Sequence, residues 1–362
     1  MANINKTMME GLNSKVLQAY LNVILMPLTY QFFFPLKQNV FFAWKTLSNV
    51  LQQPNVAADL KAQNATGARK KRPIMQSASG DLPLMEISRQ MERSEIKEYQ
   101  TALALAGNDP AARALVDFWA NDVDFCFNGI QAEFEYIAWA LLSNAGALAF
   151  TTANNAYFAN EFNLDYQVDV ANKKNNSISW ATAATADPIG DFSATIKAAN
   201  LLGLNPKHIW INLANWYLLQ ATTQIKNLTQ ITINGVASVV STPSLADVNQ
   251  AMQKIAYLNG VTLHVVDQII TREIADGTRT SANPFADNVA VFTESTILGS
   301  SQYSTLQQSD PSVIYARREQ VLIKKYGSVE PLSEITIGEC DGMPVLDTAY
   351  RNMYLKTNAV AW

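Results

Sequence analysis

The segment from residue 110 to residue 145 carries the longest helical pattern in the chain and limits the folds that the chain can adopt. Asp109 suits a helix N-cap, Pro110 suits the first helical position, and Gly146 suits the position after the last turn. A helix of about 35 residues would be about 50 Å long. It would be either part of a coiled coil or a spine that crosses a flat molecule. Steps of three and four predict one buried apolar face, formed by Leu115, Trp119, Val123, Cys126, Ile130, Phe134, Ile137 and Leu141.

The opposite face of this helix is polar. Its residues recur with the same spacing and are Asp117, Asn121, Asp124, Asn128, Gln131 and Glu135. A polar stripe with acidic members excludes a membrane span. A carboxylate metal site in a helical bundle would need Glu-x-x-His pairs, which the chain lacks. We therefore expect the stripe to be solvated or to face a partner.

A second feature is a run of basic residues between residues 65 and 83, in the stretch ATGARKKRPIMQSASGDLP. The basic tetrad, as we call it, is Arg69, Lys70, Lys71 and Arg72. Glycine and proline on both sides predict a long two-stranded loop with a basic tip. Three interpretations stay open: a solvated loop, a salt-sensitive contact with an acidic surface of another subunit, or a contact with nucleic acid. The net charge of −4 and the pI of about 5.3 argue against broad nucleic-acid binding.

The composition indicates a globular protein of more than one packed unit. The chain has 362 residues, of which 48% are hydrophobic and only 16% are charged. A low charge content is typical of surfaces committed to partners. The two cysteines, Cys126 and Cys340, lie far apart and imply no disulfide framework, which fits a reducing compartment. The N-terminal sequence matches neither a secretion signal nor a membrane span, so we expect cytosolic synthesis.

The sequence of residues 1–60 predicts an extended arm that begins with a helix. Its sequence is rich in aromatic residues, and Pro27 and Pro35 prevent one long helix. These aromatic side chains need an apolar surface to cover them. That surface belongs either to the core of the same chain, which we favour, or to a neighbouring copy.

The second half of the chain mixes helical and strand patterns and predicts an α+β domain. Helices are expected from Asp187-Pro188 to Gly203, over residues 213–228, and from a capping box of Ser244 and Asp247 to Gly260. Strands are expected at residues 208–212, at a hairpin around Asn234-Gly235, and in several late segments. The last of these segments follows an expected Asp341-Gly342 turn.

Residues for catalysis are scarce. The only two histidines, His208 and His264, lie inside expected strands, so we interpret both as structural. Metal ligation by Cys126 with a histidine has no supporting spacing. The chain has no serine nucleophile elbow and no phosphate-binding loop. We expect no catalytic residue, no cofactor and no metal site, and therefore no enzyme.

The order of these elements resembles the major capsid proteins of tailed bacteriophages, which have the Hong Kong 97-type fold. The segment SWATAATADPIGDFSATIKAANLLGLNPKHIWINLANWYLL is similar to the phage-lambda type of head protein. The segments NPFADNVAVFTESTILG and EPLSEITIGECDGMPVLDTAYRNMYLKT are similar to later strands of that family. The resemblance covers most of the chain from about residue 30 onward.

This resemblance implies an α+β capsid fold in five parts. They are an arm with the first strands (1–60), an extended loop and its return (61–105), a peripheral domain with the spine helix (106–185), an axial domain (186–300) and C-terminal strands (301–362).

The implied function is assembly, through hexamers and pentamers, into the icosahedral shell that encloses the double-stranded DNA of a tailed phage or prophage. The implied partners are other copies of the chain, a separate scaffolding protein, a portal and a decoration protein. DNA would be held only weakly, and no membrane is involved. The implied location is the virion, after synthesis in the host cytoplasm. The alternative is a nucleic-acid-binding protein that uses residues 69–72.

On this view the loop tip and the arm would lie across an adjoining subunit. Candidate residues for the contact between subunits are Arg69, Lys70, Lys71, Arg72, Asp117, Asp124, Glu133 and Glu135.

Overall fold

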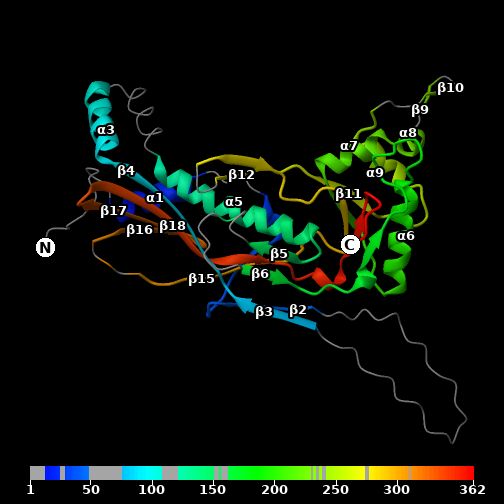
Figure 1. The fold of residues 1–362 in the computed structure, drawn as a ribbon, viewed down its shortest axis with the longest axis horizontal. Helices are drawn as coiled ribbons and strands as arrows, with labels where there is room; N and C mark the ends of the chain where they lie inside the picture. The colour runs from blue at the N-terminus through cyan, green and yellow to red at the C-terminus, as the bar shows by residue number, and fades with distance from the viewer. Residues whose placement is uncertain are drawn as a thin grey trace, which may run out of the picture. The chain divides into compact units, whose positions relative to one another are not determined.

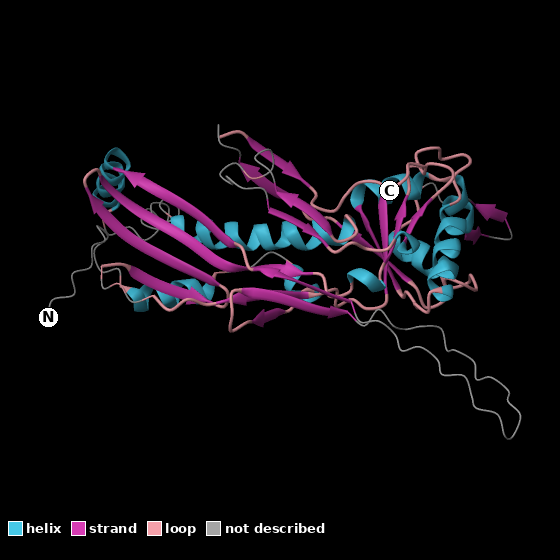
Figure 2. Cartoon of the chain, turned by 60° about the horizontal axis from the view of Figure 1, so that its bottom comes forward, coloured by secondary structure: helices cyan, strands magenta, loops and turns pink. Residues whose placement is uncertain are grey.

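The computed structural model divides into two compact units (Figures 1 and 2). Unit 1 comprises Met1–Trp44, Gly80–Glu135 and Ser301–Val345, and unit 2 comprises Lys45–Ser79, Tyr136–Ser300 and Leu346–Trp362. The five segments expected from the resemblance are a finer division and stay a prediction. The structure describes residues 13–24, 29–48, 76–107, 121–150, 155, 162–229, 231–233, 236–238, 242–273, 277–308, 310 and 312–362.

Unit 1 is built on a six-stranded sheet with long antiparallel strands at its centre (Figure 2). β18 (Leu332–Val345) pairs with β17 (Val321–Val329) and with β4 (Leu84–Glu92). β16 (Ile314–Arg318) extends the sheet beyond β17, and β15 (Ser300–Ser304) and β1 (Leu36–Gln38) extend it beyond β18. Long-range pairing therefore brings the arm, the middle of the chain and its last third into one sheet.

The helix α5 (Asp122–Ser143) contacts this sheet through its first half. At the contact, a Cβ on Gly338 of β18 would lie 2.9 Å from the carbonyl oxygen of Cys126, so only glycine allows this approach. The predicted apolar face is confirmed in the described part of the helix: Val123, Cys126, Ile130, Phe134, Ile137 and Leu141 are all buried.

The C-terminal end of α5 is also confirmed. Ala145 and Gly146 have positive φ angles of 53° and 75°, and the Gly146 N–H donates to the Leu141 carbonyl at 2.9 Å. This is the hydrogen bond of a Schellman motif, which needs the left-handed backbone that glycine tolerates best. The predicted start at Asp109 and Pro110 lies outside the described residues.

The expectation of a solvated polar face on α5 is wrong for two of its residues. Gln131 is only 1% exposed and Glu135 is 0% exposed. The N-terminal arm of the same chain covers them. The Glu135 carboxylate accepts hydrogen bonds from the backbone N–H groups of Thr29 (3.0 Å) and Tyr30 (2.8 Å). Tyr30 donates its hydroxyl proton to Gln131 and accepts from Gln320 at 2.7 Å.

The arm thus packs on its own unit over its described residues, where the first of the two interpretations of its aromatic residues holds for Tyr30, Phe34 and Trp44. α1 (Ser14–Val23) lies against β16, where Gln18 donates to and accepts from the backbone of Arg317. α2 (Tyr30–Phe33) follows, and its first N–H groups are those bound by Glu135.

The expected two-stranded excursion has its base in the described residues. β2 (Ala43–Ser48) pairs with β3 (Gln76–Asp81), while the basic tetrad lies outside the described residues. The expected return of the loop is not all extended, because α3 (Arg93–Ala106) forms there. A reciprocal capping box between Glu92 and Glu95 starts this helix.

Unit 2 contains a five-stranded sheet in the order β11 (Thr262–Val266), β8 (His208–Asn212), β14 (Val289–Thr293), β19 (Met353–Lys356) and β7 (Lys173–Asn175). Four helices bury one face of it: α6 (Pro188–Leu201), α7 (Leu213–Ala221), α8 (Thr223–Leu228) and α9 (Leu245–Met252). Trp180, Phe192 and Phe292 form the aromatic centre of this core, with edge-to-face contacts at 5.4 and 5.7 Å.

Local signals placed the starts of α6 and α9 well, but α9 ends at Met252 and not at the predicted Gly260. Asp187 caps α6 through the Gly190 N–H, and Ser244 and Asp247 form the predicted capping box of α9. The predicted single helix over residues 213–228 is instead two helices. Thr222 interrupts it with an extended backbone, and its hydroxyl accepts the Ile225 N–H as the N-cap of α8.

Three two-stranded sheets complete the described strands: β9 (Ile231–Ile233) with β10 (Val236–Ser238), β5 (Ala147–Phe150) with β6 (Phe162–Asp165), and β12 (Ile270–Glu273) with β13 (Arg279–Ala282). The described parts also include two short 3₁₀ helices, η1 (Val170–Asn172) and η2 (Ala349–Arg351). The antiparallel pairing of β9 and β10 confirms the predicted hairpin, whose Asn234-Gly235 turn lies outside the described residues.

The predicted turn at Asp341-Gly342 is wrong. Both residues lie inside β18, which continues to Val345. The glycine serves close packing, because a Cβ at Gly342 would lie 2.8 Å from the Cβ of Tyr303. The Asp-Gly pair therefore has the composition of a turn but is held in a strand by its neighbours.

The arm–helix contact can be tested by Glu135→Gln. The amide keeps one acceptor but places a donor near an arm N–H, so we expect a loss of about 1–3 kcal/mol in the free energy of unfolding. Hydrogen exchange at the Thr29 and Tyr30 amides should accelerate. The exposed Glu98→Gln on α3 is the control and should change stability by less than about 0.5 kcal/mol. Unchanged exchange at both arm amides would contradict this account.

Candidate functional site

The described residues place three of the eight candidate contact residues. Asp124 accepts a hydrogen bond from the Tyr20 hydroxyl of α1 at 2.9 Å, Glu133 is half-buried on α5, and Glu135 is buried against the arm. The other candidates, Asp117 and the basic tetrad, lie outside the described residues. Asp124 and Glu135 are thus bound within their own chain. A contact between subunits through any of the eight residues stays a prediction.

Sequence analysis missed a row of charged residues where α5 meets the sheet of unit 1. Arg89 of β4 and Lys325 of β17 both lie opposite Thr336 of β18 in the strand register. The Arg89 guanidinium lies 3.6 Å from the centre of the Phe125 ring and 3.7 Å from the Asp122 carboxylate. Lys325 is buried and donates to the Thr336 hydroxyl at 3.2 Å.

Burial shifts the pKa of two residues in this row, Lys325 and Asp122. It lowers the pKa of Lys325, which the nearby carboxylates of Glu334 and Asp122 partly offset. Burial also raises the pKa of Asp122, against the effect of Lys325 and Arg89. These residues give the buried charges between α5 and the sheet their partners, so we interpret the row as structural. Only the pairing of β17 with β18 reveals it, because the two lysines in VLIKKYG show no partner in the sequence.

The two histidines, interpreted separately in the sequence, are brought together by unit 2. The Nδ1 of His208 lies 3.0 Å from the Nε2 of His264, so one ring donates a hydrogen bond to the other. The His264 ring also stacks on Trp210, with ring centres 4.4 Å apart. Burial lowers the pKa of both rings, that of His264 to about 4. Both imidazoles are therefore neutral at neutral pH.

Neither cysteine has the character of a nucleophile. Both are free and buried. Burial raises the pKa of the Cys126 thiol to about 12 and raises that of Cys340 further. A thiol that stays protonated at neutral pH is inert as a nucleophile.

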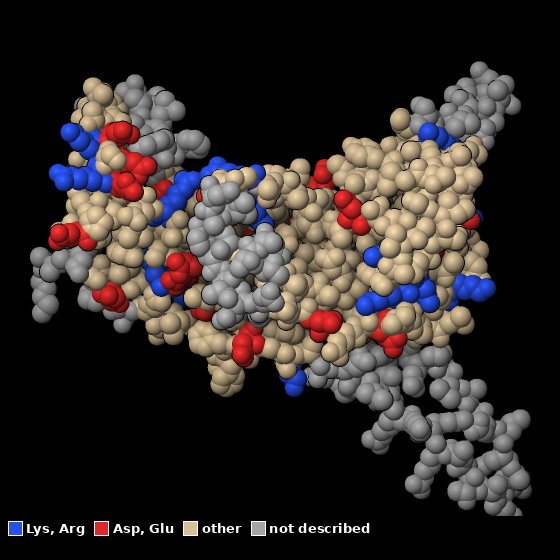
Figure 3. Space-filling model, in the orientation of Figure 1, with Lys and Arg blue, Asp and Glu red and all other residues tan. Residues whose placement is uncertain are grey.

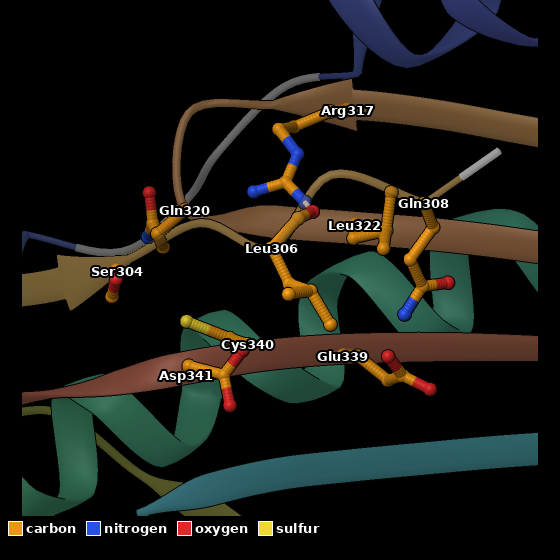
Figure 4. Close-up of a pocket in the computed structure, with 9 residues that line it drawn as sticks. All are labelled: Ser304, Leu306, Gln308, Arg317, Gln320, Leu322, Glu339, Cys340 and Asp341. Atoms are coloured by element: carbon orange, nitrogen blue, oxygen red, sulfur yellow. Dashed lines mark hydrogen bonds between the residues drawn. The ribbon is translucent and has the colours of Figure 1, made fainter. Parts of the chain in front are cut away.

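Two hollows lie at the surface of unit 1, and neither resembles a catalytic cleft. The first is between strands of the sheet, with Arg317, Gln320 and Glu339 among its lining residues (Figure 4). Its volume of about 10 Å³ leaves room for about one water molecule. The second is an open hollow of about 510 Å³ beside α1 and Tyr315, lined by Ser14, Lys15, Gln18, Ala19, Asn22 and Tyr315.

The face shown in Figure 3 carries acidic and basic side chains in small mixed groups, separated by wide uncharged areas. On that face the described residues form no broad basic field, in agreement with the acidic composition. A broad basic field is the usual signature of a surface that follows a nucleic-acid backbone.

The described ranges contain no group of three or more His, Cys, Asp or Glu side chains placed to hold a metal ion. In the same ranges, no helix combines the length and the hydropathy that a membrane crossing requires.

An exposed apolar cluster on unit 1 is the clearest candidate for a contact surface. Three consecutive residues after β1 make up most of it: Val40 is 88% exposed, Phe41 is 78% exposed and Phe42 is 47% exposed. Leu84, at the start of β4, is exposed as well. Exposed runs of this kind are costly in water and usually mark an interaction site.

The raised pKa of the Asp191 carboxyl group in unit 2 should make the stability of the fold depend on pH. Burial raises the pKa of Asp191, while the Trp180 indole N–H at 2.8 Å opposes this shift. The folded chain then binds more protons than the unfolded chain, so stability falls as pH rises above 3.8 through the folded pKa. Asp191→Asn should remove this dependence and raise stability at pH 7 by less than about 1 kcal/mol, because solvent screens the half-exposed group.

Thermal unfolding of Asp191→Asn and the unmodified chain between pH 3.5 and about 7 measures the difference. Parallel stability curves for the two proteins would contradict the prediction. Asp169→Asn, at the N-cap of η1, is the control for the removal of one negative charge.

Comparisons with known proteins identify the fold. A protein assigned as the capsid protein of a prophage in Escherichia coli CFT073 is 16% identical to this chain, with a TM-score of 0.57, and the match covers 95% of this chain and 99% of that one. A phage-related protein of Bordetella bronchiseptica RB50 is 11% identical, with a TM-score of 0.52, and the match covers 96% and 98% of the two chains.

No protein-family pattern matches the chain, and no curated protein matches its sequence. The evidence for relationship is therefore the architecture, over nearly the whole length of both chains. The chain has the α+β Hong Kong 97-type fold of phage capsid proteins, as the resemblance implied.

Proposed function

We propose that this chain is the major capsid protein of a tailed bacteriophage or prophage. Copies of it assemble, through hexamers and pentamers, into the icosahedral shell that encloses the double-stranded DNA. One observation carries the proposal: the fold matches that of a prophage capsid protein over 95% of this chain and 99% of the other.

The same proposal sets the partners and the location. The main partner is another copy of the chain, and a separate scaffolding protein, a portal and a decoration protein would complete the particle. The shell is made in the host cytoplasm and ends in the virion. Its low charge content suits surfaces that are covered by neighbours, and its acidic balance suits a lining that does not hold DNA tightly.

Electron microscopy of the purified chain, alone and co-expressed with a scaffolding protein, tests the proposal. We expect closed particles of uniform diameter. A chain that stays monomeric under both conditions would overturn it. The alternative, a nucleic-acid-binding protein, instead predicts gel-shift affinity that falls steeply with salt.

The basic tetrad provides a specific test. Changing Arg69, Lys70, Lys71 and Arg72 to Ser should leave the monomer folded but lower the yield or heat resistance of particles, because a salt-sensitive contact between subunits is lost. Each exposed pair contributes at most about 1 kcal/mol, but a closed shell repeats it many times. A control that changes the exposed Arg93, Lys97, Lys197 and Lys254 to Ser removes the same charge elsewhere. Equal effects of the two variants would refute a specific role for the tetrad.

The exposed apolar cluster provides an independent test. Phe41→Ser removes an aromatic side chain that is 78% exposed, so the monomer should keep its stability within about 0.5 kcal/mol. Particle yield should fall if the ring is buried against another subunit, since a buried aromatic group contributes about 2 kcal/mol or more. Val170→Ser, which changes a 79% exposed side chain on η1, is the control. Normal particles from Phe41→Ser would remove the cluster from the assembly contacts.

A further inference from the structure

The two histidines of unit 2 share one face of its sheet. β8 and β11 are parallel neighbours, with His208 opposite Thr262 and His264 opposite Trp210. Because side chains alternate along a strand, this register places both imidazoles on the same side. It is the side opposite the helix-covered core, since Ile209, Ile211 and Leu263 point into that core. No other histidine exists in the chain.

The spacing of the two rings matches that of two ligands on one metal ion. Imidazole nitrogens bind Zn²⁺ at about 2.0–2.1 Å, so two of them at adjacent coordination positions lie about 2.9–3.4 Å apart. The Nδ1 of His208 and the Nε2 of His264 lie 3.0 Å apart. The parallel strands therefore already hold two nitrogens at the distance that a cis pair of ligands requires.

The protons can be accommodated without a change in net charge. In the present hydrogen bond, one neutral ring donates its N–H and the other accepts. When an ion binds, the donor ring takes its other tautomer, with the N–H on the outward nitrogen, and both facing nitrogens then offer lone pairs. Metal binding requires neutral imidazole.

The surroundings define the kind of ion. Both rings are only partly buried, so an ion can approach from solvent. The Thr293 hydroxyl, on the paired strand β14, is engaged with Trp210 and with the Ser295 carbonyl, so water would complete the coordination shell. Two imidazoles and water suit Cu²⁺, Ni²⁺ and Zn²⁺, whereas Mg²⁺ and Ca²⁺ prefer oxygen ligands.

We propose that His208 and His264 form a two-imidazole site for a divalent transition-metal ion, with Cu²⁺ bound more tightly than Ni²⁺ or Zn²⁺. The site differs from the sequence-based interpretation of both histidines as purely structural. It is independent of the proposed capsid function. A bound ion would tie β8 to β11 and stabilise unit 2, because it binds the folded chain and not the unfolded one.

Isothermal titration of the full-length chain, prepared without a histidine tag, tests the site with Cu²⁺, Ni²⁺ and Zn²⁺, and with Mg²⁺ as the control cation. We expect one transition-metal ion per chain, a rise in the thermal unfolding temperature with Cu²⁺, and neither effect with Mg²⁺. Affinity should fall at least about tenfold in His208→Gln and in His264→Gln, since either change removes one of two ligands.

Lys207→Gln is a matched variant with the opposite expectation. Lys207 adjoins His208 and acts on it as a like charge, so its removal should leave the affinity unchanged or strengthen it. Circular dichroism checks that every variant is folded. Unchanged affinity in the double histidine variant, or no binding of Cu²⁺ by the native chain, would overturn the proposal.

A second measurement needs no variant. Electron paramagnetic resonance of Cu²⁺ bound to the native chain should show hyperfine coupling to two imidazole nitrogens. A spectrum with oxygen ligands alone, or with a single nitrogen, would contradict the site even if the histidine variants fail to fold.

Discussion

The polar stripe on α5 imposes the constraint on which unit 1 depends. A carboxylate and an amide on a long helix cannot be buried without hydrogen-bond partners, because an unpaired buried charge costs several kcal/mol. The arm supplies partners for the oxygen atoms: two backbone N–H groups for the Glu135 carboxylate and the Tyr30 hydroxyl for the Gln131 carbonyl. Among the described residues, the Gln131 Nε2 has no hydrogen-bond partner. The arm is therefore fixed by the need to satisfy the helix as much as by its own aromatic burial.

This arrangement decides which aromatic side chains of the arm are buried and which stay exposed. The aromatic side chains of Tyr30 and Phe34 are buried in the core of their own chain. The exposed apolar side chains of the described arm include Val23, Phe32 and the run from Val40 to Phe42, which lies just beyond the paired strand β1. The run from Val40 to Phe42 follows directly on a strand that pairs with β15 in the sheet of unit 1.

Unit 2 shows how a sheet can carry different chemistry on its two faces. One face is covered by helices that form an apolar core around Phe192 and Phe292. The other face carries Trp210, which stacks on His264 and lies 5.8 Å from the Trp139 ring of α5. Burial explains why the pKa of each histidine is lowered, and the strand register explains why the two rings meet.

The sequence by itself determined the features that depend on neighbours within a few residues. Capping at Asp187 and Ser244, the end of α5 at Gly146, its apolar face and the α+β order all follow from local hydrogen bonding and periodicity. Tertiary structure decided the rest. It buried Gln131 and Glu135, kept Asp341-Gly342 in a strand, and joined His208 to His264 across 56 positions of sequence. The reason is physical: local signals specify an element, but only the surface that meets it decides whether a polar face is solvated, paired or covered.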